Sequence, residues 1–151
     1  MKKEQLVRHE FEPVYDKNSE ILILGSFPSV KSREQGFYYG HPQNRFWKVL
    51  AAIVQEKIPD SIEEKKEMLL RNHIAVYDVI WQCKITGSSD SSIKDVVPAD
   101  ITTIVELSKI RKIYANGKLA EKLFSKYQEK KVGIKAIGLP STCLLYTSEA
   151  A

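Results

Sequence analysis

Short apolar runs alternate with amphipathic stretches along most of this chain. Residues 21–25 read ILILG, a continuous apolar run closed by glycine, which is typical of a strand buried on both faces. Three later segments repeat this pattern, at 74–80, 110–115 and 132–139. Apolar residues recur with helical spacing between these runs, at 45–55, 61–72, 100–109 and 118–129. The pattern therefore predicts four strands that alternate with four helices.

Strands that alternate with helices predict a parallel sheet with right-handed crossovers, because each helix must return the chain to the same end of the sheet. We expect an α/β fold, a three-layer α/β/α sandwich around a four-stranded parallel sheet. The 151 residues suffice for one domain of this kind. No repeat or linker interrupts the pattern, apart from the polar loop TGSSDSS at 86–92.

Ligands of such sheets bind where the strands end at their carboxyl termini. Four polar or glycine-containing segments follow the predicted strands: GSFPS at 25–29, Asp78, ANG at 115–117 and LPST at 139–142. GSFPS has neither the G-x-G-x-x-G spacing of a dinucleotide fold nor the GK[ST] of a P-loop. It predicts a tight turn that aims backbone N–H groups into the crevice, or simply a strand that turns into a loop.

Charge and cysteine content narrow the function classes only a little. The net charge of +4 favours polyanionic partners in general. Cys83 and Cys143 match neither a metal-binding spacing nor a disulfide framework, which indicates reduced thiols in a cytoplasmic protein. No segment approaches the length of a membrane span, so we expect neither export nor membrane insertion.

The stretch FYYGHPQNRFW at 37–47 places aromatic rings in a loop where a polar sequence would be ordinary. We expect Phe46 and Trp47 to lie in the core because of their positions on the helix, and Phe37 has a core reading as well. Tyr38 and Tyr39 suit a core edge or a stacking surface for bases equally. The residues alone leave these two readings of the tyrosines open.

The polar residues of the same stretch also have two readings each. Asn44 immediately precedes a predicted helix, and on this ground alone an N-cap is the preferred role. His41 can donate to a phosphate or a base, or it can order the loop beside Pro42. The three scattered histidines and two distant cysteines give no metal-binding pattern, so we expect no metal and no cofactor.

Five segments of the chain, taken in order, resemble motifs of the uracil-DNA glycosylase superfamily, specifically of its DNA-deoxyinosine (hypoxanthine-DNA) glycosylase branch. They are GSFPS, FYYGHPQNRFWKVL, GSSDSSI, ANG and LPST. The resemblance spans residues 8–142. Related mismatch-specific glycosylases carry their catalytic Asn in the first turn, where this chain has Phe27. In the deoxyinosine branch the catalytic amide belongs to the HPxNRFW element, which implies that Asn44 is catalytic here. The resemblance thus reverses the preference for a cap, although one Asn can serve both roles.

The resemblance further implies a monofunctional glycosylase that flips a deaminated base out of DNA and hydrolyses its N-glycosidic bond. The implied base-binding residues are Gly25, Ser26, Phe27, Tyr39, His41, Asp78 and Asn116. The implied DNA-binding residues are Ser29, Lys31, Ser141 and Thr142. Asp78 is expected to accept N1–H of hypoxanthine, or else to be a solvated or capping carboxylate. The expected partner is DNA with deaminated bases, bound by a monomer and away from any membrane.

The chain departs from the family pattern at its end. The family's last motif resembles LPSTSPAN, whereas this chain reads LPSTCLLYTSEAA. We therefore expect a single glycosylase-like domain over residues 1–151 that is truncated at its C-terminus, with a non-native tail after Thr142. Two rival functions stay open, a non-catalytic nucleic-acid-binding module and a nucleotide-binding α/β protein. The release of hypoxanthine from a deoxyinosine duplex separates the first rival from a glycosylase.

Overall fold

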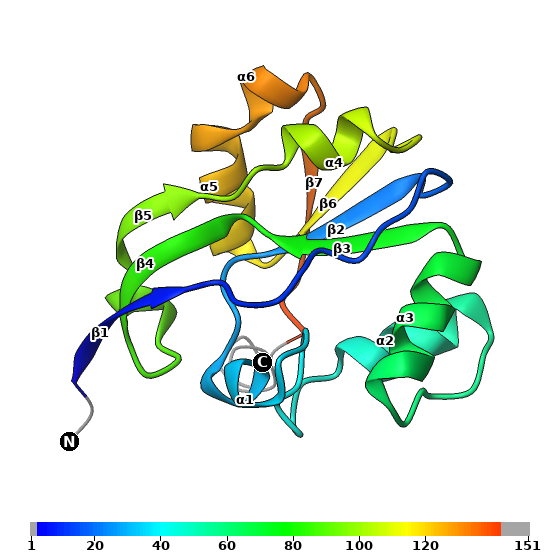
Figure 1. The fold of residues 1–151 in the computed structure, drawn as a ribbon, viewed down its shortest axis with the longest axis horizontal. Helices are drawn as coiled ribbons and strands as arrows, with labels where there is room; N and C mark the ends of the chain where they lie inside the picture. Colours follow the sequence, from blue (N-terminus) through cyan, green and yellow to red (C-terminus); the bar gives the residue numbers. More distant parts are fainter. Residues whose placement is uncertain (1–2, 143–151) are drawn as a thin grey trace.

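A four-stranded parallel sheet lies at the centre of the computed structural model, which describes residues 3–142 (Figure 1). Its order is β3-β2-β6-β7, from the strands β2 (Ile21–Gly25), β3 (Ile74–Asp78), β6 (Lys112–Asn116) and β7 (Ala136–Leu139). All neighbouring strands run parallel. The four predicted strands and their parallel sheet are confirmed, and the observed strands are shorter than the apolar runs at 74–80 and 132–139.

Helices cover both faces of this sheet. The four predicted helices are present as α2 (Phe46–Val54), α3 (Ile62–Arg71), α4 (Thr102–Glu106) and α5 (Lys118–Tyr127). Two short helices, α1 (Val30–Gln35) and α6 (Glu129–Val132), were not expected. Figure 1 shows α1, α2 and α3 on one side of the sheet and α4, α5 and α6 on the other. None of the helices within residues 3–142 is long and apolar enough to cross a membrane.

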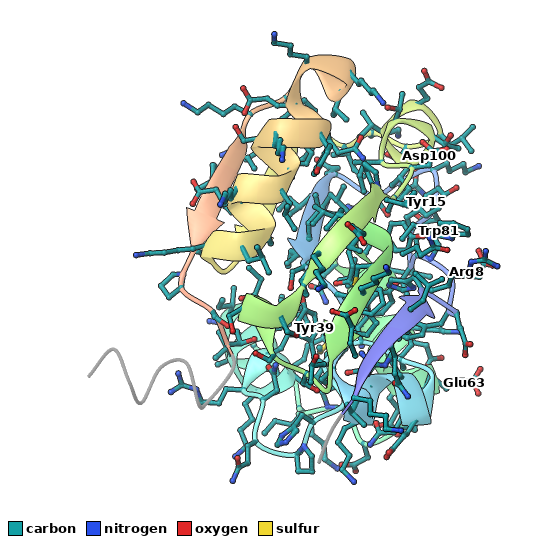
Figure 2. All side chains as sticks on the ribbon, turned by 90° about the vertical axis from the view of Figure 1, so that its left-hand side faces the viewer. Arg8, Tyr15, Tyr39, Glu63, Trp81 and Asp100 are labelled. Atoms are coloured by element: carbon teal, nitrogen blue, oxygen red, sulfur yellow. The ribbon has the colours of Figure 1, made fainter. Side chains whose placement is uncertain are left out.

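A second, antiparallel sheet was also not predicted. It has the order β1-β4-β5, from β1 (Glu4–Arg8), β4 (Ile80–Thr86) and β5 (Lys94–Pro98). The side chains of β1 and β5 are mostly exposed, so these strands lack the apolar pattern that marks the central sheet. The Arg8 guanidinium lies 5.3 Å from the ring centre of Trp81 at the surface of this sheet (Figure 2).

The aromatic residues of the 37–47 stretch pack into the core. Phe37, Phe46 and Trp47 are buried, as expected, and Tyr38 is buried with them. The Tyr38 hydroxyl donates to the carbonyl of Glu12 at 2.8 Å, which satisfies its polar end. Tyr38 is thus a core residue, whereas Tyr39 is only half-buried. Cys83 is buried and Cys143 lies outside the described residues.

The strand register brings the carboxyl ends of the central strands to one edge. Gly25 pairs with Asp78, and Asn116 pairs with Leu139. The outer edge of β3 is covered by Val14, which exchanges two backbone hydrogen bonds with Val76 at 2.9 and 3.0 Å. The carboxyl edge is therefore where the predicted site residues converge.

Candidate active site

The turn that follows β2 is held against the start of β4. The carbonyl of Gly25 accepts from the Val79 N–H at 2.9 Å, and the carbonyl of Ser26 accepts from the Ile80 N–H at 3.1 Å. The N–H groups of Ser26 and Phe27 donate to no group among residues 3–142. This turn therefore offers two adjacent backbone donors that have no partners among the described residues.

Asp78 lies directly beside this turn, and it is almost completely buried, with 3% of its surface exposed. A Cβ at Gly25 would overlap the Asp78 Oδ1 atom and lie 3.1 Å from the Tyr39 hydroxyl oxygen. Gly25 thus leaves room for a carboxylate and a phenol at the same point. The solvated reading of Asp78 is wrong, because so little of the side chain reaches the surface.

The second oxygen of Asp78 has a buried partner that the sequence did not indicate. Oδ2 lies 2.7 Å from Nε2 of His9, whose side chain is fully buried. Oδ1 accepts no hydrogen bond from the described residues. One oxygen of the carboxylate is therefore anchored, and the other faces the Gly25 turn.

Tyr39 joins this cluster through its hydroxyl group and presents its ring separately. Its φ of 53° is unusual for a residue with a side chain. One face of the ring stacks on Phe46, with ring centres 3.9 Å apart and planes 17° apart. The hydroxyl is buried without a hydrogen bond of normal geometry, although the Asn116 amide lies beside it. Burial and the charge of Asp78 raise the pKa of Tyr39, so the hydroxyl keeps its proton.

Asn44 lies one residue before Arg45, the N-cap residue of α2, which makes no side-chain capping bond. The predicted N-cap position of Asn44 is therefore wrong by one residue, and its side chain caps the first turn from outside that position. The Asn44 Oδ1 atom accepts the Phe46 N–H at 2.9 Å, and the side chain is half-buried. The backbone N–H of Asn44 donates to the carbonyl of His41 at 2.9 Å. The capping bond fixes the direction of the amide and leaves its NH₂ group without a partner among the described residues.

His41 orders this same loop. Its Nδ1 atom accepts the backbone N–H of Gln43 at 3.1 Å, which fixes the imidazole relative to the Gly40–Gln43 turn. The loop-ordering reading therefore has direct support in the structure. The opposite ring nitrogen, Nε2, has no hydrogen bond to the rest of the described chain.

Asn116 and Thr142 form a reciprocal clamp between β6 and the segment after β7. The Asn116 Nδ2 atom donates to Thr142 Oγ1, and the Thr142 N–H donates to Asn116 Oδ1, both at 3.1 Å. The carbonyl of Thr142 also accepts the Arg45 N–H at 3.0 Å. Thr142 thus connects the end of β6 to the residue that follows Asn44.

Ser29 is the N-cap residue of α1, and Lys31 lies in the first turn of this helix. The Ser29 side chain caps α1 by accepting the Ser32 N–H at 3.2 Å. Lys31 is exposed and lies 3.7 Å from Glu34. The Phe27 ring, in the place where related enzymes carry an Asn, packs under the Arg33 guanidinium at 5.7 Å. These three side chains therefore have structural contacts of their own.

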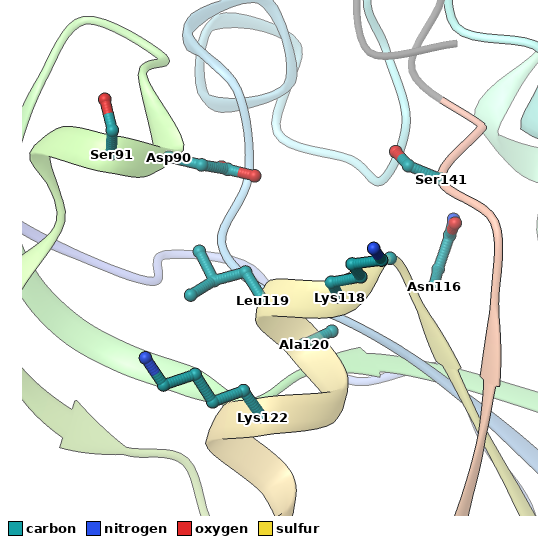
Figure 3. Close-up of a pocket in the computed structure, with 9 residues that line it drawn as sticks. Asp90, Ser91, Asn116, Lys118, Leu119, Ala120, Lys122 and Ser141 are labelled. Atoms are coloured by element: carbon teal, nitrogen blue, oxygen red, sulfur yellow. The ribbon is translucent and has the colours of Figure 1, made fainter. Parts of the chain in front are cut away.

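A cavity of about 300 Å³ opens next to Asn116. It is lined by the end of β6, the first turns of α5, the 90–91 segment and Ser141. Figure 3 shows Asp90 and Ser141 facing one another across it, above Lys118. Burial raises the pKa of the Asp90 carboxyl. Lys118 and Lys122 line the cavity and make this side of the site basic.

The structure thus brings together most of the predicted residues and adds His9. The group at the sheet edge comprises Gly25, Ser26, Tyr39, Asp78, Asn116 and Thr142, with Asn44 joined to it through Arg45. A signal for His9 was present, because Val7, His9 and Phe11 alternate and so share one inward face. Residues 3–142 contain no group of three or more His, Cys, Asp or Glu side chains that could hold a metal ion.

A family model, that of the uracil DNA glycosylase superfamily, matches residues 12–149. A Methanosarcina barkeri protein named hypoxanthine DNA glycosylase is 34% identical over 142 residues, 93% of this chain and 85% of that protein. A Methanosarcina acetivorans protein of the same name is 38% identical over 117 residues, 76% of this chain and 74% of that protein.

A solved structure is similar to this chain over nearly its whole length. It is the solution NMR structure of a Methanosarcina acetivorans protein that was provisionally named a uracil DNA glycosylase. The TM-score is 0.83 at 32% sequence identity, and the match covers 97% of this chain and 91% of that one. The expected fold class is therefore confirmed.

Proposed function

Since this chain belongs to the uracil DNA glycosylase superfamily, we propose that it removes hypoxanthine from DNA by hydrolysing the N-glycosidic bond, which leaves an abasic site. The observation that carries the proposal is the cluster of Asp78, Tyr39 and the Gly25 turn at the carboxyl edge of the sheet. Relatives that share 34–38% of its residues bear the name of this activity. We further propose that it acts as a monomer on DNA that contains deaminated bases.

Recognition starts with a base that has left the duplex, because the glycosidic carbon is inaccessible within the stack. In this proposal the face of Tyr39 opposite Phe46 stacks on the extrahelical base, a contact that contributes about 1–3 kcal/mol per base. Phe46 supports the opposite face of the same ring, which holds it in place. Stacking of this kind accepts any base, so selectivity must come from the base edge.

Asp78 supplies that selectivity in this proposal. Hypoxanthine carries a proton on N1, and the Asp78 Oδ1 atom accepts a hydrogen bond from this N1–H group. Adenine carries a bare lone pair on N1, so the same carboxylate repels it. Uracil and xanthine also present a ring N–H beside a carbonyl, and we include them as further substrates. Deamination of adenine thus turns N1, the position that Asp78 contacts, from an acceptor into a donor.

Stabilisation of the departing base provides much of the rate acceleration in this proposal. As the bond breaks, positive charge develops on the sugar and negative charge on the base. The N–H groups of Ser26 and Phe27 have no partner among residues 3–142, and they are oriented by the bonds that hold the turn. Preorganised donors of this kind are worth more than the same groups in water, because they need no rearrangement during the reaction.

Asn44 positions the attacking water. An amide is too weak a base to deprotonate water at neutral pH, so its task is orientation. The Phe46 N–H already occupies one lone pair of Oδ1, which fixes the amide and leaves the other lone pair for the water. Capping and catalysis therefore use different parts of one side chain. Ser141 and Thr142 follow β7 at the same edge and face the DNA in this proposal.

Release of free hypoxanthine from a deoxyinosine duplex tests this function. We expect Asn44→Ala to lower the single-turnover rate by about 10²–10³, the scale of removing one preorganised transition-state contact. Gln43→Ala is the matched control, because Gln43 is exposed on the same loop and bonds through its backbone. Duplex binding without base release by the parent protein would instead favour a non-catalytic DNA-binding module.

A further inference from the structure

His9 is a buried titratable side chain beside Asp78 to which the proposed reaction gives no role. Its backbone N–H donates to the carbonyl of Trp81 at 2.7 Å, so the antiparallel sheet fixes its position. Aromatic rings surround the imidazole, with ring-centre distances of 4.5 Å to Phe11, 5.0 Å to Tyr77 and 5.8 Å to Tyr38. Its only polar contact in the described chain is Asp78, at 2.7 Å.

We propose that His9 is a positioning residue that holds Asp78 as a carboxylate, with Oδ1 turned toward the base, and so selects bases with a ring N–H. This inference rests on the proposed function and extends it from the contact residue to the group behind it. His9 touches neither the base nor the reacting atoms. Its effect on selectivity is transmitted entirely through Asp78.

The unpartnered nitrogen of His9 indicates which atom carries the proton. Nδ1 is buried and has no partner among the described residues. A buried N–H without an acceptor is rarer in proteins than a buried lone pair without a donor. The proton therefore belongs on Nε2, where it is donated to Asp78 Oδ2. A carboxylate that accepts this bond has no proton of its own and offers only lone pairs at Oδ1.

This arrangement matters for both recognition and chemistry. A protonated Asp78 would donate to the bare N1 of adenine, and the distinction between adenine and hypoxanthine would be lost. A carboxylate free to rotate would present either oxygen at any angle. The bond from His9 also draws negative charge toward Oδ2, away from the base, which itself becomes negative as it departs.

A comparison of two substrates isolates the role of His9. One duplex contains deoxyinosine, and the other contains its 1-deaza analogue, in which C–H replaces N1–H. In the parent, we expect deoxyinosine to react about 10- to 100-fold faster than the analogue, the range of one hydrogen bond to a charged group. In His9→Phe, which keeps the ring but loses the donor, we expect this ratio to fall to within about threefold of one.

Two further variants separate positioning from packing. His9→Gln keeps an N–H donor near the position of Nε2 and should restore most of the parent ratio. Phe11→Leu alters a ring that packs on His9 at 4.5 Å and should leave the ratio unchanged even where it lowers stability. A purely structural role for His9 predicts that its variants slow both substrates equally.

The outcomes distinguish this inference from the function on which it rests. An unchanged substrate ratio in an active His9→Phe protein overturns the positioning role alone. A parent that releases no hypoxanthine overturns the proposed function and the positioning role with it. If His9→Phe does not fold, the ¹⁵N shifts of the His9 imidazole in the parent decide. Protonated Nε2 that shifts in Asp78→Asn supports the pair, and protonation at Nδ1 alone refutes it.

Discussion

Gly25 and Gly36 precede the loop that carries Asn44, and the structure needs a glycine at each for a different reason. Gly25 lacks a Cβ because the Asp78 carboxylate occupies that space. Gly36 has open space around it but a φ of 75°, in the left-handed region where it ends α1. A side chain at Gly25 therefore displaces the site, whereas one at Gly36 strains only the backbone.

Alanine at each glycine should separate activity from stability. We expect Gly25→Ala to lower hypoxanthine release by about 10²-fold, because even a 1 Å displacement of a positioned group has effects of this size. We expect Gly36→Ala to cost about 1 kcal/mol of unfolding free energy and to keep its rate. Single-turnover rates and urea unfolding of both variants provide the measurement. Full activity in Gly25→Ala would show that Asp78 moves without consequence.

Chain position alone singled out Asp78, whereas Asn44 became a catalytic candidate only through its resemblance to the HPxNRFW element. The structure places Asp78 at the carboxyl edge of the sheet and joins Asn44 to that edge through Arg45 and Thr142. His9 was overlooked because its partner is 69 positions away, and no local pattern indicates which buried carboxylate a histidine will meet. For the same reason the sequence did not predict that the Asn116 amide would form two hydrogen bonds with Thr142.

At the scale of elements, apolar patterning predicted the central sheet and its main helices but not the second sheet. A buried parallel strand must be apolar on both faces, which makes it visible in the sequence. The strands β1 and β5 are mostly exposed, and β5 ends at Pro98, so their sequences lack the apolar pattern of a buried strand. β4 begins two residues after β3 and was merged into the same apolar run.

The clamp between β6 and the segment after β7 carries a prediction at this scale. Asn116→Ala removes two hydrogen bonds, each worth about 0.5–1.5 kcal/mol, so we expect about 1–3 kcal/mol lower stability. We also expect slower hypoxanthine release, because Thr142 holds the Arg45 N–H and hence the start of α2. Thermal unfolding and single-turnover rates measure the two effects.

Thr142→Ser is the matched control for this clamp. It keeps the hydroxyl, the N–H and the carbonyl that make the three bonds, and loses only a methyl group. It should therefore retain both stability and rate. An Asn116→Ala protein that is less stable but equally fast would show that the clamp supports the fold without positioning Asn44.

At the scale of the whole molecule, the site depends on segments from all parts of the chain. Residues near positions 9, 25, 39, 78 and 116 meet only when both sheets and the α2 loop are in place. Such long-range assembly follows from parallel strands, whose carboxyl ends gather residues that are distant in sequence. The sequence could therefore indicate the edge at which they meet, but not their mutual contacts.

Because the strands are parallel, DNA should bind at the edge of the sheet where their carboxyl ends lie. Two lysines at opposite ends of β6 test this expectation. Lys118 lines the cavity beside Asn116, at the carboxyl end of β6. Lys112 begins the same strand at the opposite end. Both are exposed, and neither makes an ion pair within residues 3–142. They differ mainly in the end of the sheet at which they lie.

Each lysine that contacts a phosphate releases a counterion, so its loss lowers the dependence of affinity on salt. We expect Lys118→Ala to reduce the slope of log K against log salt concentration by about 0.9 for a deoxyinosine duplex. Lys112→Ala should leave the slope unchanged, because it lies far from the site. The measurement is a fluorescence anisotropy titration at several salt concentrations, with an Asn44→Ala background in both variants to prevent cleavage. Equal slopes for the two lysine variants would mean that the duplex does not cross the carboxyl edge beside α5, and the cavity would then have no part in DNA binding.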